Sequence, residues 1–235
     1  MVRRNRTILE KRWPNTNDFV AVAKQWSPDA MTVLVKLVWE GYDRLLKDVI
    51  SVINFDCNEE QLERSITQLL ERKIRQSMTG DEPFDVQHEV FEFETCESPQ
   101  AQPPQYDIAF FLIDNGRIMW PLEAKVLSSD GRVSEYVKEI VDNFMTCRYA
   151  PFSSEGGMLG YLMDGNAENA FTNIEKRLNH KSVTCKLKDH PKILKRDYKT
   201  SAHQRKVPTE KLYPVEFCCH HLIFRITGGV DSIKN

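Results

Sequence analysis

Two strongly apolar segments joined by Asp-Asn-Gly constrain the fold of this chain more than any other feature. Together they predict one buried β-hairpin over residues 106–127. Three ionisable side chains, Asp107, Glu123 and Lys125, interrupt these segments. Burying a charge is costly unless the charge is paired or binds a metal. The three residues therefore indicate a site inside the hairpin.

The turn of the hairpin decides whether these side chains share a face. Glu123 and Lys125 are two residues apart, so on a strand they point to the same side. A two-residue turn at 115–116 would place Asp107 on the opposite face. A three-residue loop over 114–116, with its glycine in the left-handed conformation, would pair Asp107 with Glu123, and we predict this register. It also pairs Ile108 with Leu122, Phe110 with Trp120, Leu112 with Ile118 and Ile113 with Arg117.

The rest of the chain predicts an α/β fold of the α+β type with a mixed sheet. Hydrophobic periodicity and capping residues predict a helix over 58–78 capped by Asn58, a strand over 84–94, the hairpin, a helix over 133–147, a strand over 157–163 and a helix over 167–178.

The two ends of the chain are assigned separately. A helix is predicted to start at Ser27-Pro28-Asp29, with a shorter helix over 17–26 before it. The strand-like segment 216–227 either extends the sheet or closes a C-terminal hairpin. We expect an N-terminal helical extension, 1–57, followed by one domain, 58–235.

Composition excludes several classes of protein. With 235 residues and 41% hydrophobic content, the chain can bury one substantial core. A net charge of -2 excludes a uniformly basic nucleic-acid coat. The six cysteines lack a disulfide-framework spacing and the N-terminus lacks an apolar signal core, so we expect a cytoplasmic protein. No membrane partner is expected, because the longest apolar run, 31–39, is too short to span a bilayer.

The aspartate on one strand and Glu123-Ala124-Lys125 on the next resemble the motif of the PD-(D/E)XK nuclease superfamily, which has the restriction-endonuclease-like fold. The resemblance covers residues 58–164, where the expected order of helix, three strands, helix and strand is that fold's αβββαβ core. Tyr106 stands where the family has a proline. The three-letter pattern also occurs at 71–73 and 197–199, but only Glu123-Ala124-Lys125 lies on an apolar strand.

The resemblance implies a metal-dependent nuclease acting on DNA. Asp107, Glu123 and the carbonyl of Ala124 would hold Mg²⁺, with Mn²⁺ as an alternative ion, and Lys125 would orient or deprotonate the attacking water. The helix before the first strand often supplies a further acidic residue in this superfamily. Glu63 is our choice, with Glu59 and Glu60 as alternates.

A basic segment, 181–211, carries ten lysines and arginines against three acids, a local charge of +7. Such a segment either binds phosphates or forms a solvated loop, and both interpretations stay open. The expected nucleic-acid-binding residues are Lys192, Lys195, Arg196, Lys199, Arg205 and Lys206.

The family resemblance also suggests a setting. It implies restriction, repair or anti-phage defence, with a helicase or ATPase partner subunit as in Hachiman-type nuclease–helicase pairs. Two other classes compete: a non-catalytic nucleic-acid-binding module on the same fold, and a protein-interaction subunit. Oligomeric state is not indicated by any pattern.

The run Cys218-Cys219-His220-His221 raises the question of zinc. Adjacent residues on a strand point to opposite faces, so the four cannot close one tetrahedral shell. The sequence therefore favours buried cysteines on a strand over structural zinc.

Overall fold

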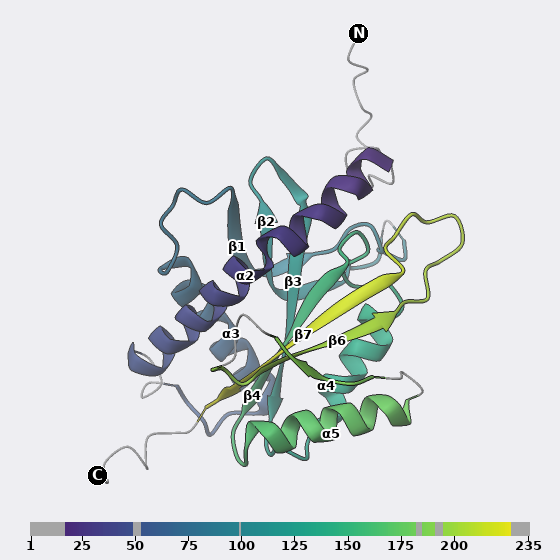
Figure 1. Cartoon of the computed structure of the whole chain (residues 1–235). Coiled ribbons are helices and arrows are strands. Elements are labelled where there is room, and N and C mark those ends of the chain that lie inside the picture. Colours follow the sequence, from purple (N-terminus) through teal and green to yellow (C-terminus); the bar gives the residue numbers. More distant parts are fainter. Residues whose placement is uncertain (1–16, 49–52, 99, 182–184, 191–194, 227–235) are drawn as a thin grey trace.

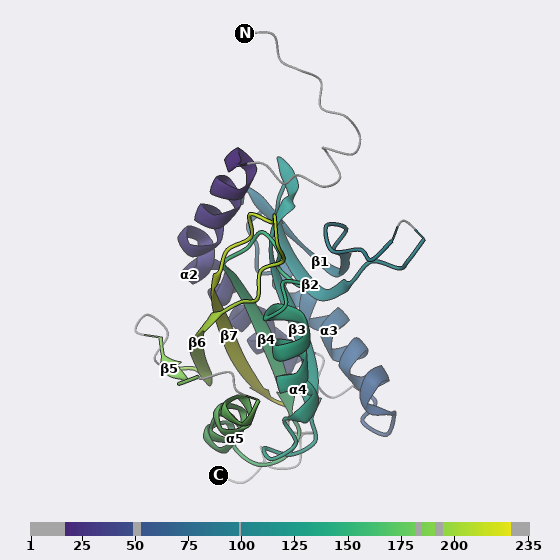
Figure 2. The ribbon, with the colours of Figure 1, turned by 90° about the vertical axis from the view of Figure 1, so that its right-hand side faces the viewer.

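The computed structural model of the chain describes residues 17–48, 53–98, 100–181, 185–190 and 195–226. A central sheet carries helices against its faces (Figure 1). Seven strands form the sheet in the order β1-β2-β3-β4-β7-β6-β5, which Figure 2 shows from one edge to the other. The pairs β3–β4 and β4–β7 are parallel, and the other neighbouring pairs are antiparallel. The predicted mixed sheet in an α/β fold is therefore confirmed.

The order of elements along the chain also matches the expectation. The described helices are α2 (Asn17–Asp48), α3 (Glu59–Arg75), α4 (Ser134–Glu139), which continues into a π-helical segment η2 (Ile140–Phe144), and α5 (Ala167–His180). The strands are β1 (Phe84–Phe91), β2 (Gln105–Leu112), β3 (Asn115–Leu127), β4 (Glu155–Leu162), β5 (Lys188–Asp189), β6 (Tyr198–Gln204) and β7 (Glu216–Arg225). From α3 to β4 the succession is helix, three strands, helix and strand.

Each face of the sheet has its own apolar core. The first joins α2 and α3 to the sheet, and the second joins α4, η2 and α5 to the sheet. The first core includes Leu34, Ile66, Ile108, Leu122 and Phe224, and the second includes Ile140, Phe144, Phe171 and Ile223. Because α2 lies within the first core, the described part of the 1–57 segment packs on the sheet. The boundary at 57–58 stays a prediction.

The first two helices differ in how well the sequence predicted them. Asn58 caps α3 as expected, since its side chain accepts from the amide of Gln61 at 2.9 Å. The expected break before Pro28 is wrong: α2 continues through it. Trp26 packs edge-on against Phe84 of β1, with ring centroids 6.4 Å apart, and this contact favours continuation despite the amide hydrogen that proline lacks.

The hairpin of β2 and β3 has the predicted register but a different turn. Pairs from Ile108–Leu122 to Phe111–Met119 follow the prediction. The chain then turns at 113–114, and a bulge leaves Leu112 facing Asn115 instead of Ile118. Gly116 has no positive φ, so the predicted left-handed glycine is wrong. The bulge lets Ile118 join a small apolar cluster with Phe152 and Tyr213.

The C-terminal half adds strands to the sheet's far side. The segment expected to extend the sheet or to close a hairpin does both, because β7 is parallel to β4 and antiparallel to β6. The basic segment 181–211 holds the two strands β5 and β6, and its other described residues form the connections around them, so it is not one continuous loop.

Candidate active site

The site residues gather where β2 and β3 separate. Strand pairing ends at Ile108 and Leu122, and beyond it two amides of β3 donate to carboxylates. Ala124 N donates to Asp107 Oδ2 at 2.8 Å, and Val126 N donates to Glu63 Oε2 at 3.1 Å. Asp107 and Glu63 thus take over hydrogen bonds that a partner strand would otherwise make. The predicted choice of Glu63 over the exposed Glu59 and Glu60 agrees with this placement.

Lys125 connects the acidic groups. Its Nζ donates to Glu63 Oε1 at 3.0 Å, to Glu123 Oε1 at 3.3 Å and to the Ala124 carbonyl at 2.6 Å. The side chains of Lys125 and Glu63 are 16% and 19% exposed, whereas that of Glu123 is 8% exposed. A ligand from solvent can therefore reach the lysine and Glu63 more easily than Glu123.

Burial shifts the ionisation of the cluster. It raises the pKa of Glu123 well above its usual value, and the charge of Asp107 raises it further against the opposing effect of Lys125. Burial likewise raises the pKa of Glu63, although Lys125 opposes the shift. Burial alone would lower the pKa of Lys125, but Glu123 and Glu63 outweigh it and hold that pKa above the ordinary range. The lysine is therefore firmly cationic, while Glu123 resists ionisation.

Sequence reasoning missed a fourth carboxylate, Glu139 at the end of α4. Its charge raises the pKa of both Glu123 and Lys125, so it acts on the same cluster, at the place where β2 and β3 separate. Asn143 donates to Glu139 Oε2 and accepts from Arg148 Nη1 at 2.8 Å. The available signal was spacing: residues 139 and 143 are four apart on a helix that returns over the strand. The π-helical segment that begins at Ile140 carried no sequence signal.

The oxygen ligands available where β2 and β3 separate fit a hard divalent cation. Asp107, Glu123 and the Ala124 carbonyl offer only oxygen, which Mg²⁺ and Mn²⁺ prefer. Glu123 Oε2 is buried and makes no hydrogen bond of ordinary geometry in the described part of the chain, while the neighbouring Asp107 carboxylate raises the pKa of Glu123, so two carboxylates face each other where a cation could bind. The Ala124 carbonyl is held by Lys125, which would have to give up this contact to a cation.

The described members of the expected DNA-binding set lie elsewhere on the molecule. Lys192 lies outside the described residues, and β6 is separated from β3 by β4 and β7 (Figure 2). Arg196 pairs with Asp43, and Lys199 pairs with Glu168 at 2.6 Å.

The other members of this set divide by exposure. Lys195 and Lys206 are exposed. Arg205 is buried and donates to the carbonyls of Ala150, Ser153 and Pro214, so its guanidinium serves the fold. We therefore leave Arg205 out of any proposed phosphate-binding surface.

Comparison of the chain with protein-family models, with curated proteins and with solved structures gave no match. Within the described residues, no helix is long and apolar enough to cross a membrane. The site and the motif are therefore the features that indicate a function.

Proposed function

We propose that this protein is an Mg²⁺-dependent nuclease that hydrolyses phosphodiester bonds in DNA, with Mn²⁺ as an alternative ion. One observation carries the proposal: Asp107, Glu123, Lys125 and Glu63 meet where β2 and β3 separate, and Glu123 Oε2 is buried without a hydrogen-bond partner among the described residues. A carboxylate pair beside a lysine, near solvent, is a suitable arrangement for metal-assisted hydrolysis. The resemblance to PD-(D/E)XK nucleases supports the same reaction.

Each residue has a distinct task in this proposal. A bound Mg²⁺ would neutralise charge that develops on the phosphate and make a water more acidic. Asp107 and Glu123 would hold the ion together with the Ala124 carbonyl. Lys125 would orient the attacking water or offset charge on the phosphate. Glu63 would position the Lys125 ammonium, because it accepts from that group at 3.0 Å.

A second candidate is a non-catalytic nucleic-acid-binding or protein-interaction subunit on the same scaffold. One observation favours it: Asp107 and Glu63 each accept from a β3 amide, and Lys125 donates to the Ala124 carbonyl. This network satisfies the backbone hydrogen-bonding groups at the edge of β3, and it does so without any catalytic role for the side chains. The buried, unpartnered oxygen of Glu123 is what it does not account for.

The motif and the cysteines support a proposal for the cellular compartment and the biological role of the protein. All six cysteines are free, which suits the reducing cytoplasm. We propose a role in restriction or anti-phage defence, with a helicase or ATPase partner subunit that regulates cleavage. This part of the proposal rests on the family resemblance.

A cleavage assay with near-isosteric variants tests the catalytic proposal. Plasmid and single-stranded DNA are incubated with Mg²⁺ and the wild type, Asp107→Asn or Glu123→Gln, alone and with the genomic partner. Both variants should lose cleavage, and EDTA should abolish it in the wild type. Glu71→Gln is the control, because Glu71 is also buried but pairs with Arg75 outside the site. Cleavage that survives Glu123→Gln or EDTA would contradict the proposal.

Calorimetry separates the two candidates even without cleavage. The wild type and Glu71→Gln should bind Mg²⁺, while Asp107→Asn and Glu123→Gln should bind it at least about tenfold more weakly, since each loses an anionic oxygen ligand. If all four proteins bind Mg²⁺ equally or not at all, the non-catalytic candidate is favoured.

A further inference from the structure

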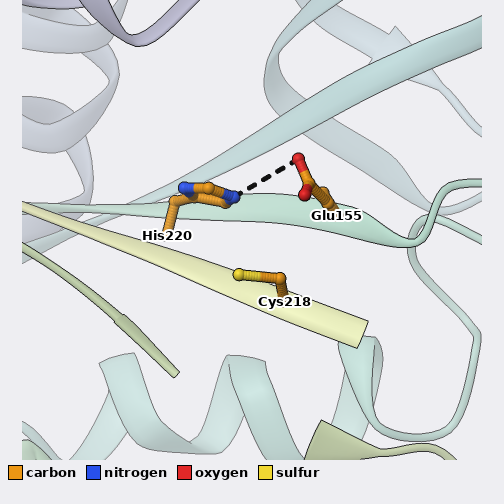
Figure 3. Close-up of side chains that lie close together, drawn as sticks. All are labelled: Glu155, Cys218 and His220. Atoms are coloured by element: carbon orange, nitrogen blue, oxygen red, sulfur yellow. Dashed lines mark ion pairs between the residues drawn. The ribbon is translucent and has the colours of Figure 1, made fainter. Parts of the chain in front are cut away.

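Three side chains of different chemistry converge where β4 and β7 begin. Glu155 and Cys218 are paired in the β4–β7 register, and His220 lies two residues further along β7, on the same face as Cys218. The three side chains approach one another across the two strands (Figure 3). Each offers a ligand atom, and these atoms all lie within 4.8 Å of one another.

Two of these ligand atoms lack a hydrogen bond. His220 Nε2 and Glu155 Oε2 are buried and have no hydrogen-bond partner among the described residues. They lie 3.5 Å apart, which is too long for a strong charged hydrogen bond. An unsatisfied buried polar atom destabilises the folded state, and native proteins retain few of them. Two such atoms pointing at one spot suggest that a ligand occupies it.

The imidazole of His220 is held in a suitable orientation. The Tyr198 hydroxyl lies 2.5 Å from Nδ1, and the two rings stack with a 10° interplanar angle. Trp120 packs edge-on against the same imidazole, at a centroid distance of 5.8 Å. When Nδ1–H donates to the tyrosine oxygen, Nε2 keeps its lone pair toward Glu155 and Cys218. A hydrogen bond of this kind typically supports histidines that ligate metals.

The ligand set and its surroundings favour zinc over a hard cation. Thiolate, imidazole and carboxylate together suit Zn²⁺, whereas Mg²⁺ and Ca²⁺ prefer oxygen throughout. Three protein ligands leave one tetrahedral position open. A cavity of about 820 Å³ has Glu155, Cys218, His203 and Lys206 in its wall. Glu155 and Cys218 are half-buried, so an ion and a fourth ligand can reach their end of the cluster from solvent.

We propose that Glu155, Cys218 and His220 form a zinc-binding site with a solvent-derived fourth ligand. Binding replaces the Cys218 thiol proton, which is released to solvent, with a sulfur–zinc bond. The Cys218-Cys219-His220-His221 run contributes only its first and third residues, because the other two point to the opposite face. Glu155 from β4 completes the set, and no sequence spacing could have shown this. The site is separate from the proposed Mg²⁺ site.

Cobalt substitution tests the site through its sulfur ligand. The full-length chain is stripped with a chelator, supplied with excess Mg²⁺ to occupy the oxygen-donor site, and titrated with Co²⁺ and then Zn²⁺. The wild type should show a thiolate-to-cobalt charge-transfer band that one equivalent of Zn²⁺ removes. The band should disappear in Cys218→Ser but persist in Cys57→Ser, which alters a half-buried cysteine outside the cluster. No band in the wild type, or a band that survives Cys218→Ser, would overturn the proposal.

Two further measurements keep the test valid if Cys218→Ser fails to fold. In the wild type, Zn²⁺ should slow alkylation of Cys218, mapped by peptide mass spectrometry, while alkylation of Cys57 continues unchanged. Equal alkylation of Cys218 with and without Zn²⁺ would overturn the proposal. Tyr198→Phe keeps all three ligands but removes the support at Nδ1, so its zinc affinity should fall about 10- to 100-fold with the band retained. Unchanged affinity would refute the positioning role of Tyr198.

Discussion

The cluster around Lys125 and the cluster around His220 are two polar sites in one sheet. They differ in how their buried polar atoms are paired. Leu122, Gly157 and His220 lie in one row across β3, β4 and β7, so the backbone of His220 lies roughly 10 Å from that of Leu122, the residue before Glu123. At Lys125, charges of both signs are close together and the ammonium donates to three oxygens, so Glu123 Oε2 is the one atom of these side chains that is buried without a partner among the described residues. At His220, neutral and acidic ligands leave two atoms without hydrogen bonds.

The difference indicates what each cluster needs to be stable. The first carries its own cation, the ammonium of Lys125, so it can exist without a bound ion, and a metal would compete with the lysine for the Ala124 carbonyl. The second contains no lysine or arginine, so an external cation is what would complete it. Substitution should therefore disturb the first cluster through its lost cation and the second through its lost ligand.

Removal of Lys125 should give the largest effect. Lys125→Met leaves Glu63 and Glu123 buried without their cation, and we expect a loss of about 3–5 kcal/mol in the free energy of unfolding. Lys73→Met is the matched control, since Lys73 is 15% exposed but its ion pair among the described residues is with the exposed Asp48, and it should cost much less. Urea unfolding measures both. Equal losses would mean that the Lys125 cluster is an ordinary surface ion pair.

Neutralising Glu123 should stabilise the protein in a pH-dependent way. Its pKa in the folded state is raised by burial and by Asp107, so ionised Glu123 opposes folding above its unfolded pKa of about 4.3. Glu123→Gln removes this penalty. The variant should match the wild type near pH 4 and gain on it as the pH rises toward the folded pKa.

The size of this gain is set by about 1.4 kcal/mol for each unit of pKa shift. Urea unfolding at several pH values measures it. Mg²⁺ should reduce the gain if Glu123 binds the ion, because a cation favours the ionised carboxylate of the wild type. A gain that is constant from pH 4 to 8 would show that Glu123 ionises normally in the fold.

The two clusters also differ in how far the sequence predicted them. Asp107, Glu123 and Lys125 could be placed together because alternation on strands and an apolar hairpin fix their register. The turn could not be predicted, since the bulge depends on Ile118 packing with Phe152 and Tyr213 from distant segments. That error left the register unchanged because both loops preserve the Ile108–Leu122 pair.

The His220 cluster lay beyond the reach of local patterns. Glu155 and Cys218 are neighbours only because β4 and β7 are parallel, and a parallel pairing across a long connection leaves no short spacing in the sequence. The same holds for Glu139, whose charge acts on Glu123 only once α4 has folded back over the sheet. Residues joined by long-range pairing need the fold before they can be recognised as one site.

Substitution of Glu155 should have a smaller, zinc-dependent effect. Without zinc, Glu155→Gln should change the free energy of unfolding by no more than about 1 kcal/mol, because the contact of the Glu155 carboxylate with His220 is long, at 3.5 Å. With Zn²⁺ at a hundred times its Kd, the wild type should gain about 2.7 kcal/mol and the variant much less. Thermal melts with and without Zn²⁺, in excess Mg²⁺, measure both. Equal zinc-dependent gains would exclude Glu155 from the site.

The smallest expected effect concerns two exposed lysines of the basic segment. Lys195 and Lys206 are exposed, and Lys206 lies in the wall of the cavity beside Glu155 and Cys218. If DNA crosses this face, Lys195→Ser and Lys206→Ser should each reduce the slope of log affinity against log salt by about 0.9, with little change in stability. Arg196→Ser should reduce it less, because its guanidinium is already paired with Asp43.

Lys36→Ser, which alters an exposed lysine on α2, is the control for this experiment. Fluorescence anisotropy over a range of salt concentrations measures the slopes. A reduced slope for Lys206→Ser together with an unchanged slope for Lys195→Ser would place DNA along the cavity and toward the His220 cluster. Unchanged slopes in both variants would assign the basic segment to another partner. The proposed nuclease would then bind DNA through surfaces closer to β2 and β3, and the two clusters would act independently.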